Sequence, residues 1–222
     1  MDDAARPTRQ QISDAVDPVG WRLVLGAIHT EVAAASLTEA TDAASVAVSA
    51  VGPDGQGHLT VDIRAGRTVL RLQSDFGGVT GRDVRLAHEV SGALAARGMP
   101  ARPGAVQALE IAIDALDIPA VRPFWKAITG YVDEAGSELV EALVDPAGSG
   151  PAIWFQQMDA PRPQRNRIHL DIDVPAEAAS ARIDAAIAAG GRLLSDDAAP
   201  AFWVLADPEG NEACICTWQG RD

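Results

Sequence analysis

Two segments of this 222-residue chain repeat the same alternation of apolar and ionisable residues. Residues 109–114 read Leu-Glu-Ile-Ala-Ile-Asp, and residues 166–174 read Asn-Arg-Ile-His-Leu-Asp-Ile-Asp-Val. Alternation at period two predicts a strand with one apolar and one ionisable face. Because the two patterns coincide, we expect an internal duplication. The alignment pairs Glu110 with His169, Ala112 with Asp171 and Asp114 with Asp173.

Each of these strands is followed by the signals of a helix and then by further strands. Pro119 and Pro175 stand in the first helical turn, where proline is tolerated. The helices are expected to end near Ile128 and Ala188, since glycines follow both positions. The repeated unit is therefore a strand, a helix and two or three more strands. Those strands are expected at residues 138–144, 152–157, 201–205 and 213–217.

The first hundred residues predict a separate module with an antiparallel sheet and helices on one of its faces. Helices are expected at residues 9–16, from a cap at Ser36 to about Val51, and after a cap at Thr80 with Asp83. Strands are expected at residues 21–32, 58–63 and 68–72. The fold class of the whole chain is therefore α+β.

The segment from Gly98 to Gly104 is rich in proline and glycine, which break both helices and sheets. We expect it to be a linker between a domain at residues 8–98 and a domain at residues 105–220.

Composition narrows the classes of partner. A net charge of −13 argues against nucleic acid, which requires a concentrated basic face. No apolar run approaches the roughly 20 residues of a membrane helix, and the polar start shows no secretory signal. Cys214 and Cys216 alternate with Ile215 on one strand and cannot easily pair, which favours a reducing, cytoplasmic setting. A small molecule is the expected partner, and assembly into a homo-oligomer stays open.

Three stretches of the C-terminal half carry a family resemblance: Pro123-Phe124-Trp125 with Gly130-Tyr131, residues 166–171, and Asp207-Pro208-Glu209-Gly210-Asn211-Glu212. In this order they resemble the glyoxalase-like branch of the vicinal oxygen chelate superfamily. The resemblance spans about residues 107–218 and implies a duplicated βαβββ module around a small-molecule cleft. Reactions in this superfamily are diverse, so lyase, isomerase and hydro-lyase steps all remain open.

The same resemblance implies where a metal would be held. His169 takes the place of a histidine ligand, and Glu110 takes the first ligand position. The second position falls on Trp154 or Gln156, and the last on Cys214 or Glu212. A divalent ion needs three or four converging ligands. Glu110, His169 and Cys214 could supply a mixed set, but a tryptophan or glutamine at the second position weakens it and favours the absence of a bound metal.

His169 and Glu110 are the predicted catalytic residues of this half. The alternative for His169 is an imidazole that only hydrogen-bonds Asp171 or Asp173. Arg165 and Arg167 could hold an anionic substrate by forked hydrogen bonds or could be solvated charges. The tryptophans could line the cleft or belong to the core. The predicted substrate-binding residues are Asp114, Trp154, Gln156, Arg167, Asp171, Glu212 and Cys214.

Three stretches of the N-terminal half carry a second resemblance: Gly20-Trp21, Val61-Asp62-Ile63-Arg64, and Gly77-Gly78-Val79-Thr80 with Asp83 and Leu86-Ala87. Through them, residues 8–97 resemble the pterin-4a-carbinolamine dehydratase family, which implies a pterin as ligand. The resemblance also implies a catalytic histidine at His58 and a ligand-site aspartate at Asp83, for which a helix cap is the alternative.

This half departs from that family at its histidines. The resemblance implies a His-His-Pro motif and a third histidine, but the chain has Gly57-His58-Leu59 and Ser74-Asp75 at those places. A general acid or base contributes about 10²–10⁴-fold to a rate. Loss of two of them predicts a domain that keeps the fold without the dehydratase activity. A binding protein without catalysis and an active dehydratase are the two alternatives.

Overall fold

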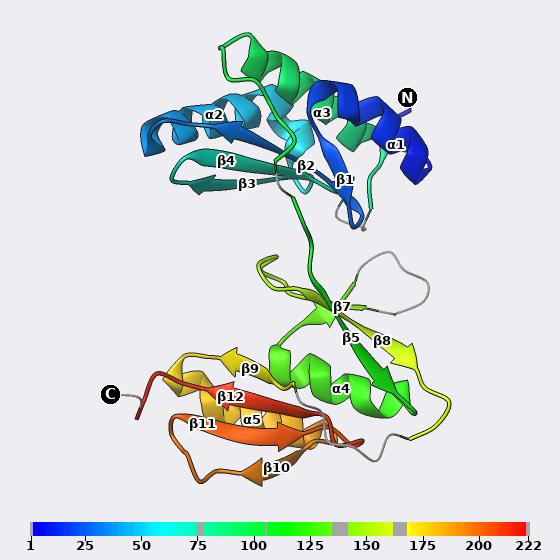
Figure 1. Ribbon diagram of the computed structural model, residues 1–222, viewed down its shortest axis with the longest axis vertical. Helices are drawn as coiled ribbons and strands as arrows, with labels where there is room; N and C mark the ends of the chain where they lie inside the picture. The colour runs from blue at the N-terminus through cyan, green and yellow to red at the C-terminus, as the bar shows by residue number, and fades with distance from the viewer. Residues whose placement is uncertain (1, 75–77, 105, 135–141, 162–167, 221–222) are drawn as a thin grey trace. The chain divides into compact units, whose positions relative to one another are not determined.

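The structure is a computed structural model that describes residues 2–74, 78–104, 106–134, 142–161 and 168–220 (Figure 1). The chain consists of two compact units, unit 1 at Met1–Ala108 and unit 2 at Leu109–Asp222. Among the described residues, no helix combines the length and the apolar character needed to cross a membrane.

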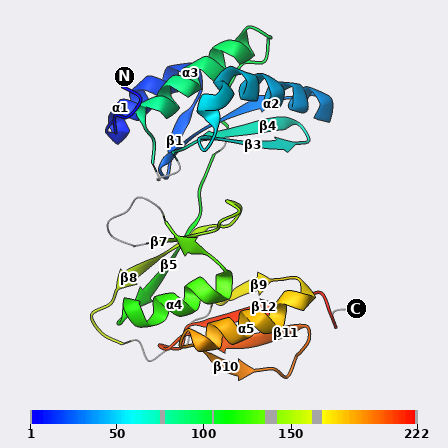
Figure 2. The same ribbon diagram turned by 180° about the vertical axis from the view of Figure 1, so that it is seen from behind.

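Unit 1 is a four-stranded antiparallel sheet, sheet A, with three helices on one face (Figures 1 and 2). The strand order is β1-β2-β4-β3. Alternate residues of the strands face the helices, and Ile28, Leu70 and Leu72 are fully buried with Trp21. The elements are α1 (Arg9–Val16), β1 (Arg22–Val24), β2 (Ala27–Ala33), α2 (Leu37–Val51), β3 (Leu59–Arg64), β4 (Arg67–Leu72) and α3 (Gly81–Ala95), with short 3-10 turns η1 (Asp17–Val19) and η2 (Gly52–Gly55).

Side-chain caps explain where these helices begin. Thr8 and Gln11 form a capping box on α1, and Thr80 and Asp83 form another on α3. Ser36 accepts a hydrogen bond from the backbone N–H of Glu39 at the start of α2. Each cap occupies backbone donors that a helix start leaves unpaired. The helix starts expected from the sequence are therefore confirmed.

The region 21–32, expected to be a strand region, is a hairpin of β1 and β2. Leu25 and Gly26 both adopt positive φ, 47° and 75°, and they turn the chain between β1 and β2. Glycine adopts this conformation without strain. The apolar pattern continues through the turn, which is why the sequence predicts a strand region without locating the turn.

The Pro/Gly segment expected to be the linker is hydrogen-bonded to unit 1. Glu31 and Arg102 exchange two backbone hydrogen bonds of 2.9 Å, and the Thr30 hydroxyl donates to the Arg102 carbonyl at 3.0 Å. Met99 and Ala101 pack on the core. The unit boundary therefore lies later in the chain, between Ala108 and Leu109.

Unit 2 contains the duplicated βαβββ module. Sheet B has the order β5-β8-β7-β6 and sheet C the order β9-β12-β11-β10, so corresponding strands occupy the same places. The elements of the first repeat are β5 (Glu110–Ala115), α4 (Ile118–Thr129), β6 (Val132–Asp133), β7 (Ala142–Val144) and β8 (Ala152–Gln157). Those of the second are β9 (Leu170–Asp173), η3 (Ala176–Ala178), α5 (Ala179–Ala188), β10 (Arg192–Ser195), β11 (Phe202–Ala206) and β12 (Glu212–Cys216).

Strand register extends the alignment made from the sequence. β5 pairs in parallel with β8, with Ala112 opposite Trp154, and β9 pairs in parallel with β12, with Asp171 opposite Cys214. With Ala112 aligned to Asp171, as the sequence pattern suggests, Trp154 stands at the place of Cys214. The fold class expected for both halves is confirmed.

The two repeats share one core. Phe124 and Ile128 of α4 belong to the same buried cluster as Ile183 of α5 and Ile215 of β12. Polar contacts also join the repeats, because the Glu209 carboxylate accepts hydrogen bonds from the backbone N–H groups of Leu116 and Asp117 at 2.9 and 2.7 Å. Unit 2 is therefore built from two modules that support each other.

One consequence of the packing in unit 1 is a dependence of its stability on pH. Burial, aided by the positive charge of the neighbouring Arg71, lowers the pKa of His29 from 6.5 to about 4. The unfolded chain therefore takes up the proton first as the pH falls, and the free energy of unfolding of unit 1 is expected to decrease between pH 6.5 and 4. Solvent screening limits the loss to about 1–2 kcal/mol, since His29 is only partly buried.

Hydrogen exchange of unit 1, measured at about pH 7 and at about pH 4.5, gives the loss of unfolding free energy. Most of the His29 titration falls between these two pH values. The His29→Gln variant is expected to show a smaller loss of unfolding free energy between these pH values. The His88→Gln variant, changed at an exposed histidine, is expected to show the same loss as the wild type. Equal pH dependence in the wild type and in His29→Gln would contradict the assignment.

Candidate functional site

The second repeat brings an imidazole, a carboxylate and a thiol together beside two neighbouring strands. Asp171 on β9 lies directly opposite Cys214 on β12 in the parallel register. His169 stands two residues before Asp171, so the alternation of an extended chain puts both on one side. The ligand atoms of His169, Asp171 and Cys214 all lie within 4.8 Å of one another.

The side of sheet C that carries this group faces away from the core. Leu170, Ile172, Ala213 and Ile215 alternate with the three residues and pack into the buried cluster. His169 Nε2 lies 3.2 Å from Asp171 Oδ1, and the two side chains are 50% and 56% exposed. Cys214 lies below them, with only 5% of its surface exposed. We call His169, Asp171 and Cys214 the β9/β12 group.

The surroundings of Cys214 make its thiol a poor nucleophile. Burial raises the pKa of Cys214 to about 12, and the negative charge of Asp171 adds to this effect. Since the thiolate is the reactive form, the thiol is inert near neutral pH. Asp173 and Glu212 follow the same alternation as Asp171 and Cys214, so this side of sheet C is strongly acidic.

The other predicted residues of this half lie in sheet B. Glu110 and Asp114 are on β5, and Trp154 and Gln156 are on β8. Glu110 is not part of the β9/β12 group, which is the one set of three or more metal-type ligands found within the described ranges. Arg167, like Arg165 and Asn166, lies outside the described residues. The structure thus brings His169 close to Asp171 and Cys214, as predicted residues of one site, but it does not place Glu110 among them.

Two cavities lie elsewhere. One of about 420 Å³ is lined by residues at the ends of β9 and β12, among them Asp173, Pro175 and Trp218. The other, of about 430 Å³, lies on unit 1 and is lined by residues that include Glu39, Arg97 and Met99. Neither lining includes His169, Asp171 or Cys214. The His169 and Asp171 side chains of the β9/β12 group are themselves exposed to solvent.

A metal site of the kind implied by the superfamily resemblance does not fit this chain. The register puts Trp154 at the place in sheet B that corresponds to Cys214, and an indole supplies no ligand atom to a cation. Glu110 also stands apart from the three donors of sheet C. A ligand set drawn from both repeats is therefore incomplete, whereas the second repeat alone offers nitrogen, oxygen and sulfur donors.

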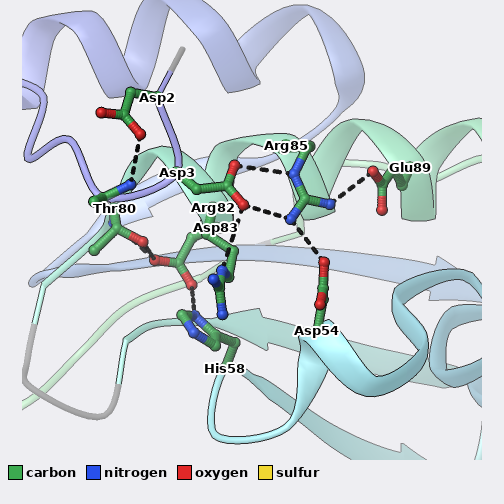
Figure 3. A network of polar contacts seen from close by, with 10 residues as sticks. Asp2, Asp3, Asp54, His58, Thr80, Arg82, Asp83, Arg85 and Glu89 are labelled. Carbon is green, nitrogen blue, oxygen red and sulfur yellow. Dashed lines mark hydrogen bonds and ion pairs between the residues drawn. The ribbon is translucent and has the colours of Figure 1, made fainter.

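Unit 1 holds its own polar site at the start of α3 (Figure 3). The Asp83 carboxylate is fully buried and accepts hydrogen bonds of 2.7 Å from the backbone N–H and the hydroxyl of Thr80. His58 Nδ1 lies 2.7 Å from the other Asp83 oxygen. The helix-cap role that the sequence offers for Asp83 is therefore confirmed, and Asp83 also contacts His58, whereas its role in binding a ligand stays a prediction.

A surface network lies beside this pair (Figure 3). Arg85 binds Asp3, Asp54 and Glu89 through hydrogen bonds of 2.7–3.1 Å. These groups are largely solvent-exposed, so each contact contributes little to stability. The network ties the N-terminal segment to α3 and leaves the His58–Asp83 pair as the buried polar centre of the site.

Comparison with known proteins finds a matching family and similar solved structures for unit 2. Residues 110–216 match the family described as a glyoxalase-like domain. A glyoxalase/bleomycin resistance protein/dioxygenase family enzyme from Burkholderia phytofirmans PsJN is 23% identical, with 49% of this chain and 95% of that chain covered and a TM-score of 0.40. A glyoxalase-related enzyme from Fulvimarina pelagi is 20% identical, with 50% and 88% covered and a TM-score of 0.41.

The fosfomycin resistance protein FosX from Listeria monocytogenes is 13% identical, with 51% of this chain and 92% of that chain covered and a TM-score of 0.41. No curated protein matches the chain. Residues 110–216 are a glyoxalase-like domain.

Proposed function

We propose that this protein is a two-domain small-molecule enzyme whose glyoxalase-like unit carries out a lyase- or isomerase-type reaction on the open side of sheet C. The observation that carries the proposal is the 3.2 Å contact between His169 Nε2 and Asp171 Oδ1 on an accessible surface. An imidazole held by a carboxylate is a common arrangement for proton transfer. Unit 1 is then a pterin-dehydratase-like domain that has lost most of its histidine set.

In this proposal His169 moves the proton. The Asp171 carboxylate holds the Nε2–H, which leaves Nδ1 with a lone pair that can accept a proton from a substrate carbon or oxygen. The imidazolium that forms is stabilised by the same carboxylate and returns the proton at a neighbouring atom. A net movement of one proton within the substrate is an isomerisation, and loss of a leaving group after the first step is a lyase reaction.

The negative charge of the site restricts the charge that a ligand can carry. Asp171, Asp173 and Glu212 all stand on the side of sheet C that carries His169. A group of carboxylates disfavours a free anion. We therefore expect a polar ligand that is neutral or cationic where it meets the sheet.

We also propose that the protein works as a homo-oligomer. The open side of sheet C presents His169 and Asp171 to solvent, and Phe202, which lies opposite Cys216 on this same side, is apolar and exposed. A second copy placed over the open side would bury Phe202 and exclude water from the proton transfer.

Deuterium exchange tests the proposal on a panel of compounds, without the natural substrate being identified first. Polar carbonyl metabolites with an exchangeable α-hydrogen are incubated with the protein in D₂O, and deuterium incorporation is followed by NMR. For the compound that exchanges, we expect His169→Ala to lower the rate by about 10²–10⁴-fold and Asp171→Asn to lower it by a smaller factor. Glu177→Gln, a change at an exposed residue of η3, is the control. Exchange that is insensitive to His169→Ala would contradict the role of His169.

Two alternatives remain. A binding protein without catalysis would show ligand-dependent thermal stabilisation and no exchange. Pterin dehydration in unit 1 is favoured by one observation, the 2.7 Å contact of His58 with the buried Asp83. We nevertheless expect unit 1 to be nearly inactive, because Gly57 and Leu59 replace the other residues of the histidine motif and Ser74 stands near the place of the third histidine.

A further inference from the structure

The cavity of unit 1 lies where the Pro/Gly segment is hydrogen-bonded to β2. Its volume of about 430 Å³ is within the range of small-molecule sites. Two arginines, Arg97 and Arg102, line it together with the apolar side chains of Met99 and Pro100. The polar site at the start of α3 contributes none of the described lining residues, so the cavity is separate from it.

The backbone fixes the positions of both arginines. Arg97 directly precedes Gly98, which has a φ of 71° and stops α3 from continuing. The backbone N–H of Met99 donates to the carbonyl of Leu94 at 3.0 Å, the hydrogen bond of a Schellman cap. Arg102 is held by its two backbone hydrogen bonds of 2.9 Å with β2. A ligand would therefore have to order only the two side chains, which lowers the cost of binding.

The guanidinium groups of this cavity are not neutralised by the protein. Within the described part of the chain, the exposed side chains of Arg97 and Arg102 have no ion pair or hydrogen bond. Other arginines of the same unit, such as Arg22, Arg64 and Arg85, each contact a carboxylate. In a protein with a net charge of −13, two uncompensated arginines that line one cavity indicate an anionic ligand.

The lining favours a doubly charged group with several oxygens. Guanidinium groups bind phosphate oxygens through forked hydrogen bonds, and two of them match the charge of a phosphate monoester, about −1.5 to −2 near neutral pH. A carboxylate offers one charge and two oxygens. The carboxylate of the lining, Glu39, already accepts the backbone N–H of Ala35 at 2.6 Å. Met99 and Pro100 provide an apolar wall for the organic part of an ester.

We propose that the cavity of unit 1 binds a phosphate monoester, with the phosphate held by Arg97 and Arg102 and the organic part packed on Met99 and Pro100. The site belongs to unit 1, so the proposal is independent of the reaction proposed for sheet C. It also assigns a role to the Pro/Gly segment, which supplies Arg102 and both apolar side chains.

An NMR titration of the full chain tests the site. Phenyl phosphate, a monoester with an apolar ring, is added to ¹⁵N-labelled protein at constant pH and ionic strength. We expect saturable shifts in the backbone amide signals of residues 33–39 and 97–102. Inorganic phosphate, which lacks the ring, is expected to bind more weakly at the same residues. Arg97→Gln and Arg102→Gln are each expected to weaken binding of phenyl phosphate about tenfold or more, since each removes hydrogen bonds to a charged group.

Arg9→Gln is the matched control. Arg9 is an exposed arginine of α1 outside the lining, so this change removes the same charge from unit 1 without altering the cavity. It is expected to leave the affinity for phenyl phosphate unchanged. Amide signals away from the cavity confirm that each variant is folded.

Absence of saturable shifts at residues 33–39 and 97–102 would overturn the proposal. An affinity that falls equally in Arg9→Gln and in Arg97→Gln would also overturn it, because the attraction would then come from the general charge of unit 1. Benzoate that binds as tightly as phenyl phosphate would overturn the choice of a phosphate over a carboxylate.

Discussion

Replacing Asp207 with alanine is expected to lower the free energy of unfolding of unit 2 by about 4 kcal/mol. The Asp207 carboxylate is fully buried and accepts four hydrogen bonds, from Trp125 Nε1 at 3.0 Å, from the backbone N–H groups of Glu209 and Asn211 at 2.9 Å, and from Asn211 Nδ2 at 2.8 Å. Hydrogen bonds to a charged group contribute about 1.5–3 kcal/mol each, and a buried donor left without a partner is costly. The loss is therefore large even if part of the site relaxes.

The duplication supplies a matched control. Asp145 follows β7 as Asp207 follows β11, and it accepts backbone hydrogen bonds from Ala147, Ser149 and Gly150. Asp145 is less buried and has no tryptophan among these donors, so Asp145→Ala is expected to cost only about 1 kcal/mol. Hydrogen exchange of peptides from α4 and from β11 to β12, measured on the full chain, gives both values. Equal losses in the two variants would show that the contact with Trp125 contributes little.

The hydrogen bonds of Asp207 also explain why residues 207–212 resemble a glyoxalase-like domain. Asp207 accepts more hydrogen bonds than the other residues of this run described above, and these bonds stabilise the fold. Asp207 shapes the turn between β11 and β12 and joins it to α4 of the first repeat. Glu209 holds the start of α4 from the same turn. Family resemblance at these positions therefore reports on the fold and not on the reaction.

Local signals are sufficient to predict most of the elements. Ser36 and Thr80 predict where two helices begin, and Gly130 ends α4 in the left-handed conformation. Alternation predicts the strands. The short strands β6 and β10 are not predicted as separate elements, because β6 has only two residues and β10 carries two exposed leucines with a shift of register next to them.

Local sequence signals do not predict which distant strands pair with each other. Asp171 and Cys214 are far apart in the sequence, and their proximity depends on the parallel register of β9 and β12. The sequence therefore leaves Cys214 and Glu212 as alternatives and groups His169 with Glu110. The Pro/Gly segment is a similar case, since its hydrogen bonds to Glu31 depend on a sheet edge formed about 70 residues earlier in the chain.

Replacing Asp83 with alanine is expected to destabilise unit 1 by about 3 kcal/mol. The buried carboxylate caps α3 through Thr80 and holds His58, so its removal leaves a backbone N–H, a hydroxyl and an imidazole without their acceptor (Figure 3). A lost cap alone costs about 0.5–2 kcal/mol, and the unpaired buried donors add to it. The start of α2 is the natural comparison, because the Glu39 carboxylate accepts a hydrogen bond from the backbone N–H of Ala35 at an exposed position.

Glu39→Ala is therefore expected to cost only about 1 kcal/mol, and hydrogen exchange of α2 and α3 in the full chain measures the two changes separately. Asp83→Asn keeps the volume and one acceptor oxygen, so it should fall between the wild type and Asp83→Ala. The same proteins test what remains of the pterin chemistry. Stopped-flow decay of a freshly generated 4a-hydroxytetrahydropterin is expected to match the uncatalysed rate in the wild type and in His58→Ala. Acceleration of about 100-fold that is lost in His58→Ala and reduced in folded Asp83→Asn would instead show that the His58–Asp83 pair is a working catalytic dyad.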